Sequence, residues 1–258
     1  MRTLLTFALA VFTLQVSFGW GPKGHAVIAD IAANHISKKT AKKVDAVLGG
    51  ETMVDVSSWP DMVRKDPKYA HTATWHFLNV DEGYTYETMP KDPKGDVYTQ
   101  LNYVIGELKG GKLSPEDEKV YLTLLIHLVG DMHCPLHTGH RSDLGGNMVP
   151  MKWFGQPTNL HSIWDSKLVE SCRPWSYSEW TENIDRNLTR KQIKEIADQP
   201  MMAWVEQSLA LSDAIYKDTP ANGDYSYDYY FKYTDTVKKQ FLDAGLRLAR
   251  LLDEIYGK

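Results

Sequence analysis

Residues 114–137 read SPEDEKVYLTLLIHLVGDMHCPLH, and this stretch predicts the central element of the fold. Ser114 followed by Pro115 and acidic residues is typical of a helix start, because serine caps free N–H groups and acids favour the positive end of the helix. From Val120 to Val129 the pattern is apolar nearly all round, which is typical of a helix buried on every side. We therefore expect a central helix from Ser114 through Met132.

Apolar residues at helical spacing predict further helices around this central one. They cover Pro22 to Ala32, Thr40 to Leu48, Asp96 to Leu108, Asn159 to Glu170, Lys191 to Lys217 with a break at Pro200, and Asp228 to Tyr256. The stretch from Gly145 to Phe154, with alternating apolar residues, is the one hairpin candidate. The sequence thus predicts a mainly α protein, a single compact multi-helix domain with one small β-hairpin.

Composition narrows the function classes. Of the 258 residues, 43% are hydrophobic and 24% charged, which is enough apolar material for one large domain or two small ones. The net charge of −4 excludes the strongly basic surface of a duplex-DNA reader, but not an enzyme that acts on nucleic acid. Two cysteines, Cys134 and Cys172, exclude a disulfide scaffold; whether they pair with each other stays open.

The first 19 residues have the pattern of a secretory signal peptide. A basic start is followed by a short apolar run, and Ser17-Phe18-Gly19 offers small residues before a cleavage point. The alternative, a membrane-spanning helix, needs about 20 apolar residues, which this run does not supply. We expect a mature chain of residues 20–258, secreted or periplasmic and without membrane insertion.

Histidine and aspartate interrupt the apolar pattern of the central helix. His127 and Asp131 stand four residues apart, so they share one helix face and can meet one metal ion. His161 and Asp165 repeat this spacing, and His137 lies between the two pairs. One such pair alone could equally be a buried hydrogen-bonded pair, but two pairs with a further histidine favour a metal site. Nitrogen and carboxylate ligands without thiolate suit Zn²⁺, with Mn²⁺ and Fe²⁺ less favoured.

Seven sequence blocks, in order, resemble the trinuclear-zinc, single-strand-specific nucleases, a family that includes fungal and plant enzymes and is related to zinc-dependent phospholipase C. The blocks are Trp20-Gly21-Pro22-Lys23-Gly24-His25, Ser58-Trp59-Pro60-Asp61 with Arg64, Trp75-His76-Phe77, His127 to His137, Asp143-Leu144-Gly145-Gly146-Asn147, Trp153-Phe154-Gly155, and Asn159 to Asp165. The final helix is also similar, through Ala244 to Ala249. Each block alone is weakly specific, whereas seven in register are very specific.

The resemblance implies three Zn²⁺ ions and a ligand set. One zinc would be held by Asp61, His76, His127 and Asp131, and a second by His137, His161 and Asp165. The third would be held by His25, by Asp131 as a bridge, and by the α-amino nitrogen and carbonyl oxygen of Trp20. Only cleavage after Gly19 creates that amine. The remaining histidines (His35, His71, His133 and His140) are expected on the surface or beside the ligands.

The resemblance also implies roles in catalysis and substrate binding. Asp61 would orient or deprotonate the attacking water, and Arg64 would hold a phosphoryl oxygen; the alternative for Arg64 is a surface helix arginine. Phe77 would stack on a base, or else be a core residue. Asn147 would contact the nucleotide, or else be a turn residue. Asn79 stands where fungal members commonly have an aspartate that grips the base, so base preference is expected to differ.

The expected function is a secreted zinc phosphodiesterase that hydrolyses single-stranded DNA and RNA to 5′-phosphate products. Its expected substrates also include 3′-nucleotides, and the protein is expected to be a monomer. The alternatives are a zinc-dependent phospholipase C and a non-catalytic exported metal-binding protein. Arg64 argues against the second alternative, because a storage site has no use for a phosphate-binding arginine.

Overall fold

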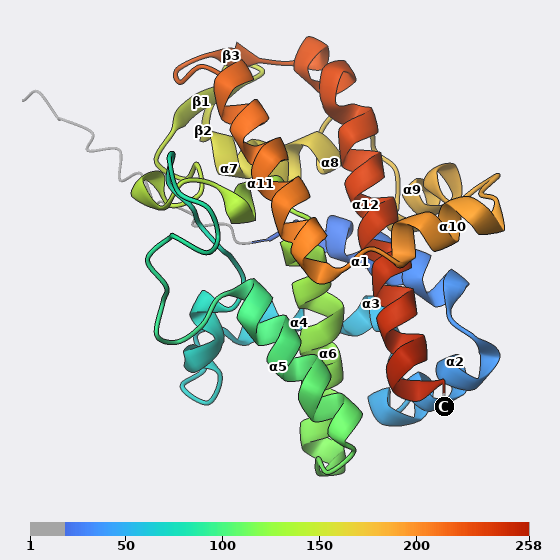
Figure 1. The fold of residues 1–258 in the computed structure, drawn as a ribbon. Helices are drawn as coiled ribbons and strands as arrows, with labels where there is room; N and C mark the ends of the chain where they lie inside the picture. Colours follow the sequence, from blue (N-terminus) through green and yellow to red (C-terminus); the bar gives the residue numbers. More distant parts are fainter. Residues whose placement is uncertain (1–18, 258) are drawn as a thin grey trace, which may run out of the picture.

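The computed structural model describes residues 19–257 and is mainly α-helical, as expected (Figure 1). Apart from Gly19, the predicted signal peptide lies outside the described residues. The longer helices are α1 (Pro22–His35), α2 (Lys38–Leu48), α5 (Val97–Gly110), α6 (Pro115–Met132), α9 (Tyr177–Ile184), α10 (Arg190–Ala197), α11 (Met201–Asp218) and α12 (Tyr227–Tyr256). Short helices are α3 (Met53–Val56), α4 (Trp59–Val63), α7 (Leu160–Ser162) and α8 (Leu168–Glu170), with 3₁₀ turns η1 (Ala70–Thr74), η2 (Pro135–Thr138) and η3 (Arg141–Asp143).

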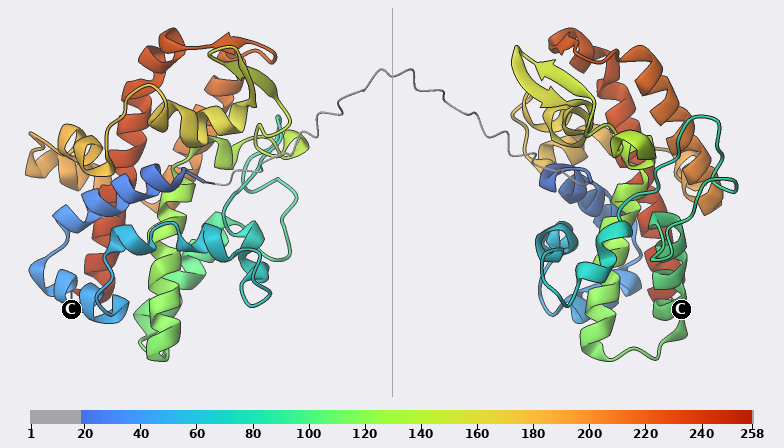
Figure 2. Two further views of the ribbon diagram at one scale, coloured as in Figure 1. Left: turned by 180° about the vertical axis from the view of Figure 1, so that it is seen from behind. Right: turned by 90° about the vertical axis from the view of Figure 1, so that its left-hand side faces the viewer.

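Helix α6 is the central element, as its sequence predicts. Ser114 caps it by accepting a hydrogen bond from the Asp117 N–H at 3.1 Å. Every residue from Leu122 to Met132 is buried, because α1, α5 and α12 pack around it. In both views of Figure 2, α12 lies beside α6. The carboxyl end of α6, with its histidine and aspartate side chains, therefore lies inside the molecule.

Helices α1 and α12 make a close contact across the core. At Gly245, a Cβ atom would lie 2.5 Å from Ile31 Cγ2, so only glycine permits this approach. Trp20, just before α1, packs edge-on against Phe241 of α12 with ring centroids 4.7 Å apart. These contacts hold the start of α1 against α12, and Trp20 is completely buried.

The β structure differs from the predicted hairpin over Gly145 to Phe154. The strands are β1 (Pro150–Trp153), β2 (Gln156–Asn159) and β3 (Asp224–Tyr225); β1 pairs antiparallel with β2 and parallel with β3. Phe154 and Gly155 both have positive φ, which makes the tight turn of a β-hairpin. The hairpin exists, but it runs from Pro150 to Asn159. Gly145 and Gly146 also have positive φ and form a turn instead of a strand.

The helix predicted over Asn159 to Glu170 is present as an uninterrupted helical run from Leu160 to Glu170, but its middle turn is π-helical. A π-helical turn (Ile163–Lys167) separates α7 from α8. The predicted break at Pro200 is confirmed, because α10 ends before it and α11 begins after it. Both cysteines are free thiols, and Cys134 is buried.

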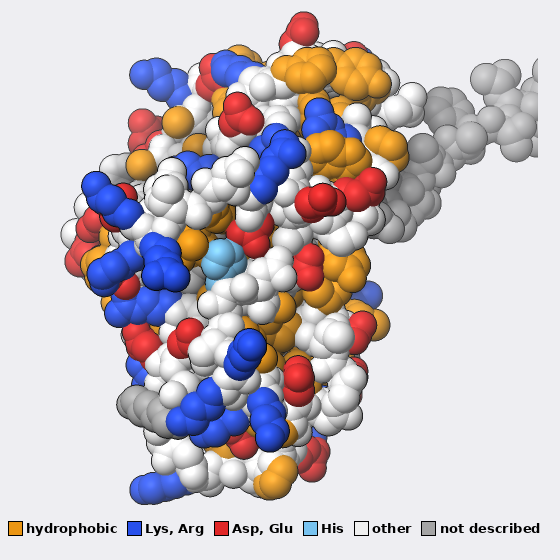
Figure 3. All heavy atoms as spheres, turned by 90° about the vertical axis from the view of Figure 1, so that its right-hand side faces the viewer, with side chains coloured by type: hydrophobic (Ala, Val, Ile, Leu, Met, Phe, Trp, Pro, Cys, Tyr) orange, Lys and Arg blue, Asp and Glu red, His pale blue; other side chains and the backbone are white. Residues whose placement is uncertain are grey.

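The outer surface of the helical domain carries charges of both signs. On the face seen in Figure 3, basic and acidic side chains are interspersed, consistent with the small net charge. No helix within the described residues 19–257 is both long enough and apolar enough to cross a lipid bilayer.

Candidate metal centre and substrate cavity

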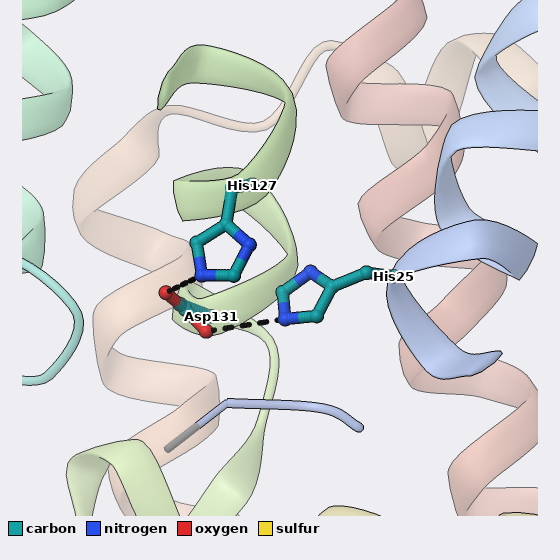
Figure 4. Close-up of side chains that lie close together, drawn as sticks. All are labelled: His25, His127 and Asp131. Carbon is teal, nitrogen blue, oxygen red and sulfur yellow. Dashed lines mark ion pairs between the residues drawn. The ribbon is translucent and has the colours of Figure 1, made fainter. Parts of the chain in front are cut away.

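The carboxylate of Asp131, near the end of α6, lies at the centre of a buried histidine cluster. Its Oδ2 atom is 2.9 Å from His76 Nδ1 and 3.0 Å from His127 Nε2. Its Oδ1 atom is 3.5 Å from His25 Nε2 and also 3.5 Å from His137 Nδ1. Figure 4 shows the two oxygens directed toward two different histidines, His127 and His25. The two oxygens thus face different histidine pairs, as a carboxylate bridging two metal ions would.

Four separate segments bring these side chains together. His127 and Asp131 share a face of α6, as the spacing of four predicts. His25 comes from α1 and reaches α6 at Gly130, where a Cβ atom would lie only 2.7 Å from His25 Nδ1. His76 follows the 3₁₀ turn η1, and His137 lies in η2, which begins at Pro135 shortly after the end of α6. The glycine at position 130 is therefore a packing requirement of the cluster.

Asp61, on α4, lies at the open side of this cluster. Its Oδ1 atom is 3.7 Å from both His76 Nδ1 and His127 Nε2. Arg64, one helical turn further on, places Nη2 3.5 Å from the same oxygen. Asp61 and Arg64 are partly exposed, unlike the histidines, which are at most 1% exposed. A substrate arriving from solvent can reach both.

Three of the histidines are oriented by hydrogen bonds to backbone carbonyls. In each case the ring Nδ1–H group is the donor. His127 donates to Ser57 O at 2.7 Å, His137 to His76 O at 2.5 Å and His161 to Gly145 O at 2.8 Å. This pattern is characteristic of metal-binding histidines, because it fixes the ring and leaves Nε2 available for the metal.

Several buried polar atoms of the cluster have no hydrogen-bond partner within the described chain. They are both ring nitrogens of His25, Nε2 of His76, Oδ1 of Asp61 and Oδ1 of Asp131. Two groups bring their ligand atoms within 4.8 Å of one another: His25, His127 and Asp131, and Asp61, His76 and His127. Buried polar atoms are normally paired. These donor atoms therefore fit one or more bound cations.

The histidines and carboxylates of the cluster shift each other's pKa values. Burial opposes a charge on His127, but Asp131 and Asp61 raise its pKa to about 9. Burial also disfavours ionised Asp131, yet His127 and His137 hold its pKa well below the usual range. Burial lowers the pKa of His137 to about 3. A divalent cation bound here would interact favourably with the same carboxylates.

The second predicted group consists of His137, His161 and Asp165. The rings of His137 and His161 stack with centroids 5.4 Å apart. Among the described residues 19–257, Asp165 belongs to neither of the two groups whose ligand atoms all lie within 4.8 Å of one another. Burial, together with the nearby charges of Asp61 and Asp131, raises the pKa of Asp165 well above its usual value. Asp165 is therefore close enough to sense these carboxylates.

The backbone just before Trp20 passes through the cluster. The Gly19 N–H donates to His137 Nε2. A Cβ atom on Gly19 would lie 2.4 Å from Asp131 Oδ1 and 2.9 Å from His25 Nε2. In the uncleaved chain, residue 19 thus occupies space between three of the candidate ligands.

A cavity of about 290 Å³ adjoins the cluster. His137 and His161 line it, together with Phe77, Asn79 and Asn147, the three predicted substrate-binding residues. The backbone of Leu78 donates to His137 O at 2.7 Å, which places residues 77–79 alongside η2. The cavity wall is completed by the 81–96 loop, by Leu144 and by Arg141. Sequence reasoning assigned no role to Arg141, because no motif marks it.

The amide side chains in this cavity are only partly satisfied. Asn147 donates through Nδ2 to Leu144 O at 2.9 Å. The Oδ1 atoms of Asn79 and Asn147 are buried and accept no hydrogen bond from any described residue. Both oxygens are therefore suited to accept hydrogen bonds from a ligand.

The four histidines not assigned as ligands have other contacts. His133 is buried and bonded to Arg247, His35 pairs with Asp185, and His140 stacks on Tyr216. His71 packs edge-on against Trp75.

Comparison with known proteins agrees with this geometry. Endonuclease 2 of Arabidopsis thaliana is 28% identical over 93% of this chain and 91% of its own length. Endonuclease 3 of the same plant is 29% identical over 92% and 89%. Nuclease P1 of Penicillium citrinum is 26% identical over 92% and 98%. The sequence model of the S1/P1 nuclease family matches residues 20–257, and the chain therefore belongs to this family of enzymes that hydrolyse nucleic acids.

Proposed function

We propose that this nuclease is a zinc-dependent phosphodiesterase that cuts single-stranded DNA and RNA, leaves 5′-phosphates and also removes phosphate from 3′-nucleotides. The observation that carries the proposal is the adjacency of two features. A cluster of metal-type ligands with unpaired buried atoms shares His137 and His161 with a cavity sized for a small aromatic ligand. One part suits a phosphate and the other suits a base.

The donor set supports zinc. It contains imidazole nitrogen and carboxylate oxygen without thiolate, a combination that zinc accepts readily. Three ions would be held by Asp61, His76, His127 and Asp131, by His137, His161 and Asp165, and by His25, Asp131 and the amine and carbonyl of Trp20. When bound, they would lower the pKa of water and offset the charge of the phosphate.

Asp61 and Arg64 are the proposed catalytic pair. Because Asp61 Oδ1 lies between the cluster and solvent, it can accept a proton from an attacking water and keep that water aimed at phosphorus. The planar guanidinium of Arg64, 3.5 Å from Asp61, can donate to a phosphoryl oxygen. The partial exposure of both side chains is consistent with contact with substrate.

The cavity accounts for a preference for single strands. Phe77 can stack on a base, and the Oδ1 atoms of Asn79 and Asn147 can accept hydrogen bonds from its edge. A base in a duplex is stacked and paired, so it cannot enter the cavity without being extruded. Unpaired strands avoid that cost.

Cleavage after Gly19 is also proposed. The family match begins at Trp20, and Gly19 lies against Asp131 and His25. Removing residues 1–19 would both vacate that space and create an amine at the same place. The mature enzyme would then be secreted or periplasmic.

The test combines metal analysis with defined substrates. The purified protein is incubated separately with single-stranded DNA, with the same sequence as a duplex, with RNA and with a 3′-nucleotide. The ends of the products are then identified. We expect bound zinc, preferential cleavage of single strands and 5′-phosphate ends, with Asp61→Asn inactive on all substrates. Equal cleavage of duplex and single strand would contradict the proposal. Turnover of phosphatidylcholine without turnover of RNA would favour the phospholipase alternative.

A further inference from the structure

Arg141 is a cation at the mouth of the substrate cavity. It begins η3, and its side chain lines the cavity that His137 and His161 also line. Arg141 is itself exposed, whereas the two histidines are buried. It therefore lies where the cavity meets solvent, whereas the two histidines line its buried part.

The guanidinium of Arg141 is only partly used by the protein. Nη1 donates to the backbone oxygen of Pro90 at 3.1 Å, which connects η3 to the 81–96 loop. Over the described residues 19–257, this contact is the guanidinium's one hydrogen bond, and no carboxylate lies within ion-pair distance of it. Nη2 and Nε thus remain available to donate to a ligand.

The nearest acidic residues are committed to their own turns. Asp143 accepts from the Gly146 N–H and from the Tyr216 hydroxyl, and Asp81 accepts from the Ser142 N–H. Within the cavity wall, Asp96 accepts from the Thr99 N–H and the Tyr86 hydroxyl, and Asp92 from the Lys94 N–H. Arg141 is the one side chain of the cavity lining that brings a permanent positive charge.

We propose that Arg141 binds a second, non-reacting phosphate: the 5′-phosphate of the nucleotide whose base occupies the cavity. This inference rests on the proposed function, in which the 3′-phosphate of that nucleotide lies at the metal ligands. With the base inside and the 3′ side at the floor, the 5′ side of the sugar points to the mouth. A guanidinium there can donate two parallel hydrogen bonds to a phosphate.

Such a contact favours polymers over mononucleotides. Every internal nucleotide of a strand carries a 5′-phosphate, but a nucleoside 3′-phosphate does not. Arg141 would therefore raise the efficiency of the endonuclease reaction while leaving removal of a lone 3′-phosphate unchanged.

The experiment compares a nucleoside 3′-phosphate with the corresponding 3′,5′-bisphosphate, because both carry the same reacting group. Release of the 3′-phosphate is measured for the zinc-loaded wild type and for Arg141→Gln and Arg141→Lys. Arg186→Gln is the matched control: it removes the same charge from an exposed position in the α9–α10 connection, on the opposite side of the molecule from the 81–96 loop (Figure 1). Zinc content is measured for each variant.

We expect the wild type to favour the bisphosphate by about tenfold in kcat/KM, the scale of one charge-assisted hydrogen-bonding contact. Arg141→Gln should abolish this preference through KM, whereas Arg186→Gln should leave the rates on both substrates unchanged. Arg141→Lys should retain part of it, because lysine keeps the charge and loses the planar fork.

Equal losses on both substrates would overturn the inference and assign Arg141 to holding the 81–96 loop through Pro90. Equal efficiencies for the two substrates in the wild type would overturn it as well, without affecting the proposed function. Hydrolysis of neither substrate would instead refute the 3′-nucleotidase activity on which the inference rests.

Discussion

Two buried polar clusters lie at the carboxyl end of α6, and they differ in how their atoms are satisfied. In one, Asp131 Oδ1 and both nitrogens of His25 have no hydrogen-bond partner in the described chain. In the other, His133 donates through Nδ1 to Val129 O at 2.7 Å and accepts from Arg247 Nη1 at 2.6 Å. Both clusters contain buried histidine and charge, but only in the second are both nitrogens of the histidine paired.

The second cluster shows what a completed polar network looks like in this fold. Arg247 on α12 is 2% exposed, and its Nη2 donates to Gln199 Oε1 at 2.6 Å and to Gln207 Oε1 at 2.8 Å. Here the chain supplies its own cation. In the Asp131 cluster the ligands are present and the cation must come from outside. Unpaired buried atoms, rather than histidine content, therefore distinguish a binding site from a structural network.

The largest expected effect comes from removing the shared carboxylate with Asp131→Ala. Since Asp131 faces two histidine pairs, the variant should lose two of the three proposed zinc ions. Hydrolysis should fall by roughly 10³-fold, the scale on which loss of a preorganised electrostatic group lowers kcat. Zinc is measured by elemental analysis, with Asp45→Ala on the exposed face of α2 as the control. Loss of one ion or none would contradict a bridging role.

A second prediction concerns the start of the chain. A protein that keeps Gly19 should hold about one zinc ion fewer than a protein that begins at Trp20, because an amide nitrogen is a poor ligand and Gly19 lies between His25 and Asp131. Activity at neutral pH should fall with it. Both proteins are made without export and compared by zinc content and rate. Equal zinc content and rate in the two proteins would show that the amine is not a ligand.

The second cluster should respond through stability instead. Arg247→Met leaves the buried His133 Nε2 atom without a donor and removes the hydrogen bonds to Gln199 and Gln207, so we expect a loss of about 3 kcal/mol in the free energy of unfolding. Zinc content at saturating zinc should not change. Urea unfolding measures the free energy of unfolding, and we expect the value for Arg247→Lys to lie between those of the wild type and Arg247→Met. A variant that lost zinc but kept its stability would erase the distinction between the clusters.

The smallest effect is expected at Asn79. Its Oδ1 atom is buried and unpaired, like Oδ1 of Asp131, but Asn79 lines the substrate cavity. Asn79→Asp should change relative rates on the four RNA homopolymers by a few-fold, since an amide donates as well as accepts and a carboxylate only accepts. Zinc content serves as the control. Unchanged relative rates would mean that Asn79 does not contact the base.

Much of the helical fold could be predicted from the sequence because local signals decide it. The cap at Ser114, the apolar run of α6 and the break at Pro200 depend on neighbouring residues alone. The hairpin boundaries were wrong because Gly145 and Gly146, which resemble a strand start, adopt positive φ beneath Leu136, where no Cβ atom fits. The π-helical turn within 159–170 has no signal in the spacing of apolar residues.

For the site, spacing predicts only what one helix carries. His127 and Asp131 share a face of α6, and the structure places them 3.0 Å apart. The contacts of Asp131 with His25 and His76 join segments far apart in the chain, and only the family resemblance indicated them. Arg141 was not predicted at all, because a single arginine in a loop has no pattern until the fold places it at a cavity.

The cavity and the metal ligands are built from different kinds of structure, and this has an evolutionary consequence. Helix α6, buried along its inner half, carries His127 and Asp131, whereas Asn79, Arg141 and Asn147 come from loops and short turns. A substitution in α6 disturbs the core and the chemistry together, so such changes are rarely tolerated. Loop substitutions alter which nucleotides are accepted at little cost to folding. Proteins that descend from a common ancestor with this fold can therefore diverge in nucleotide preference while they retain the same metal-binding residues.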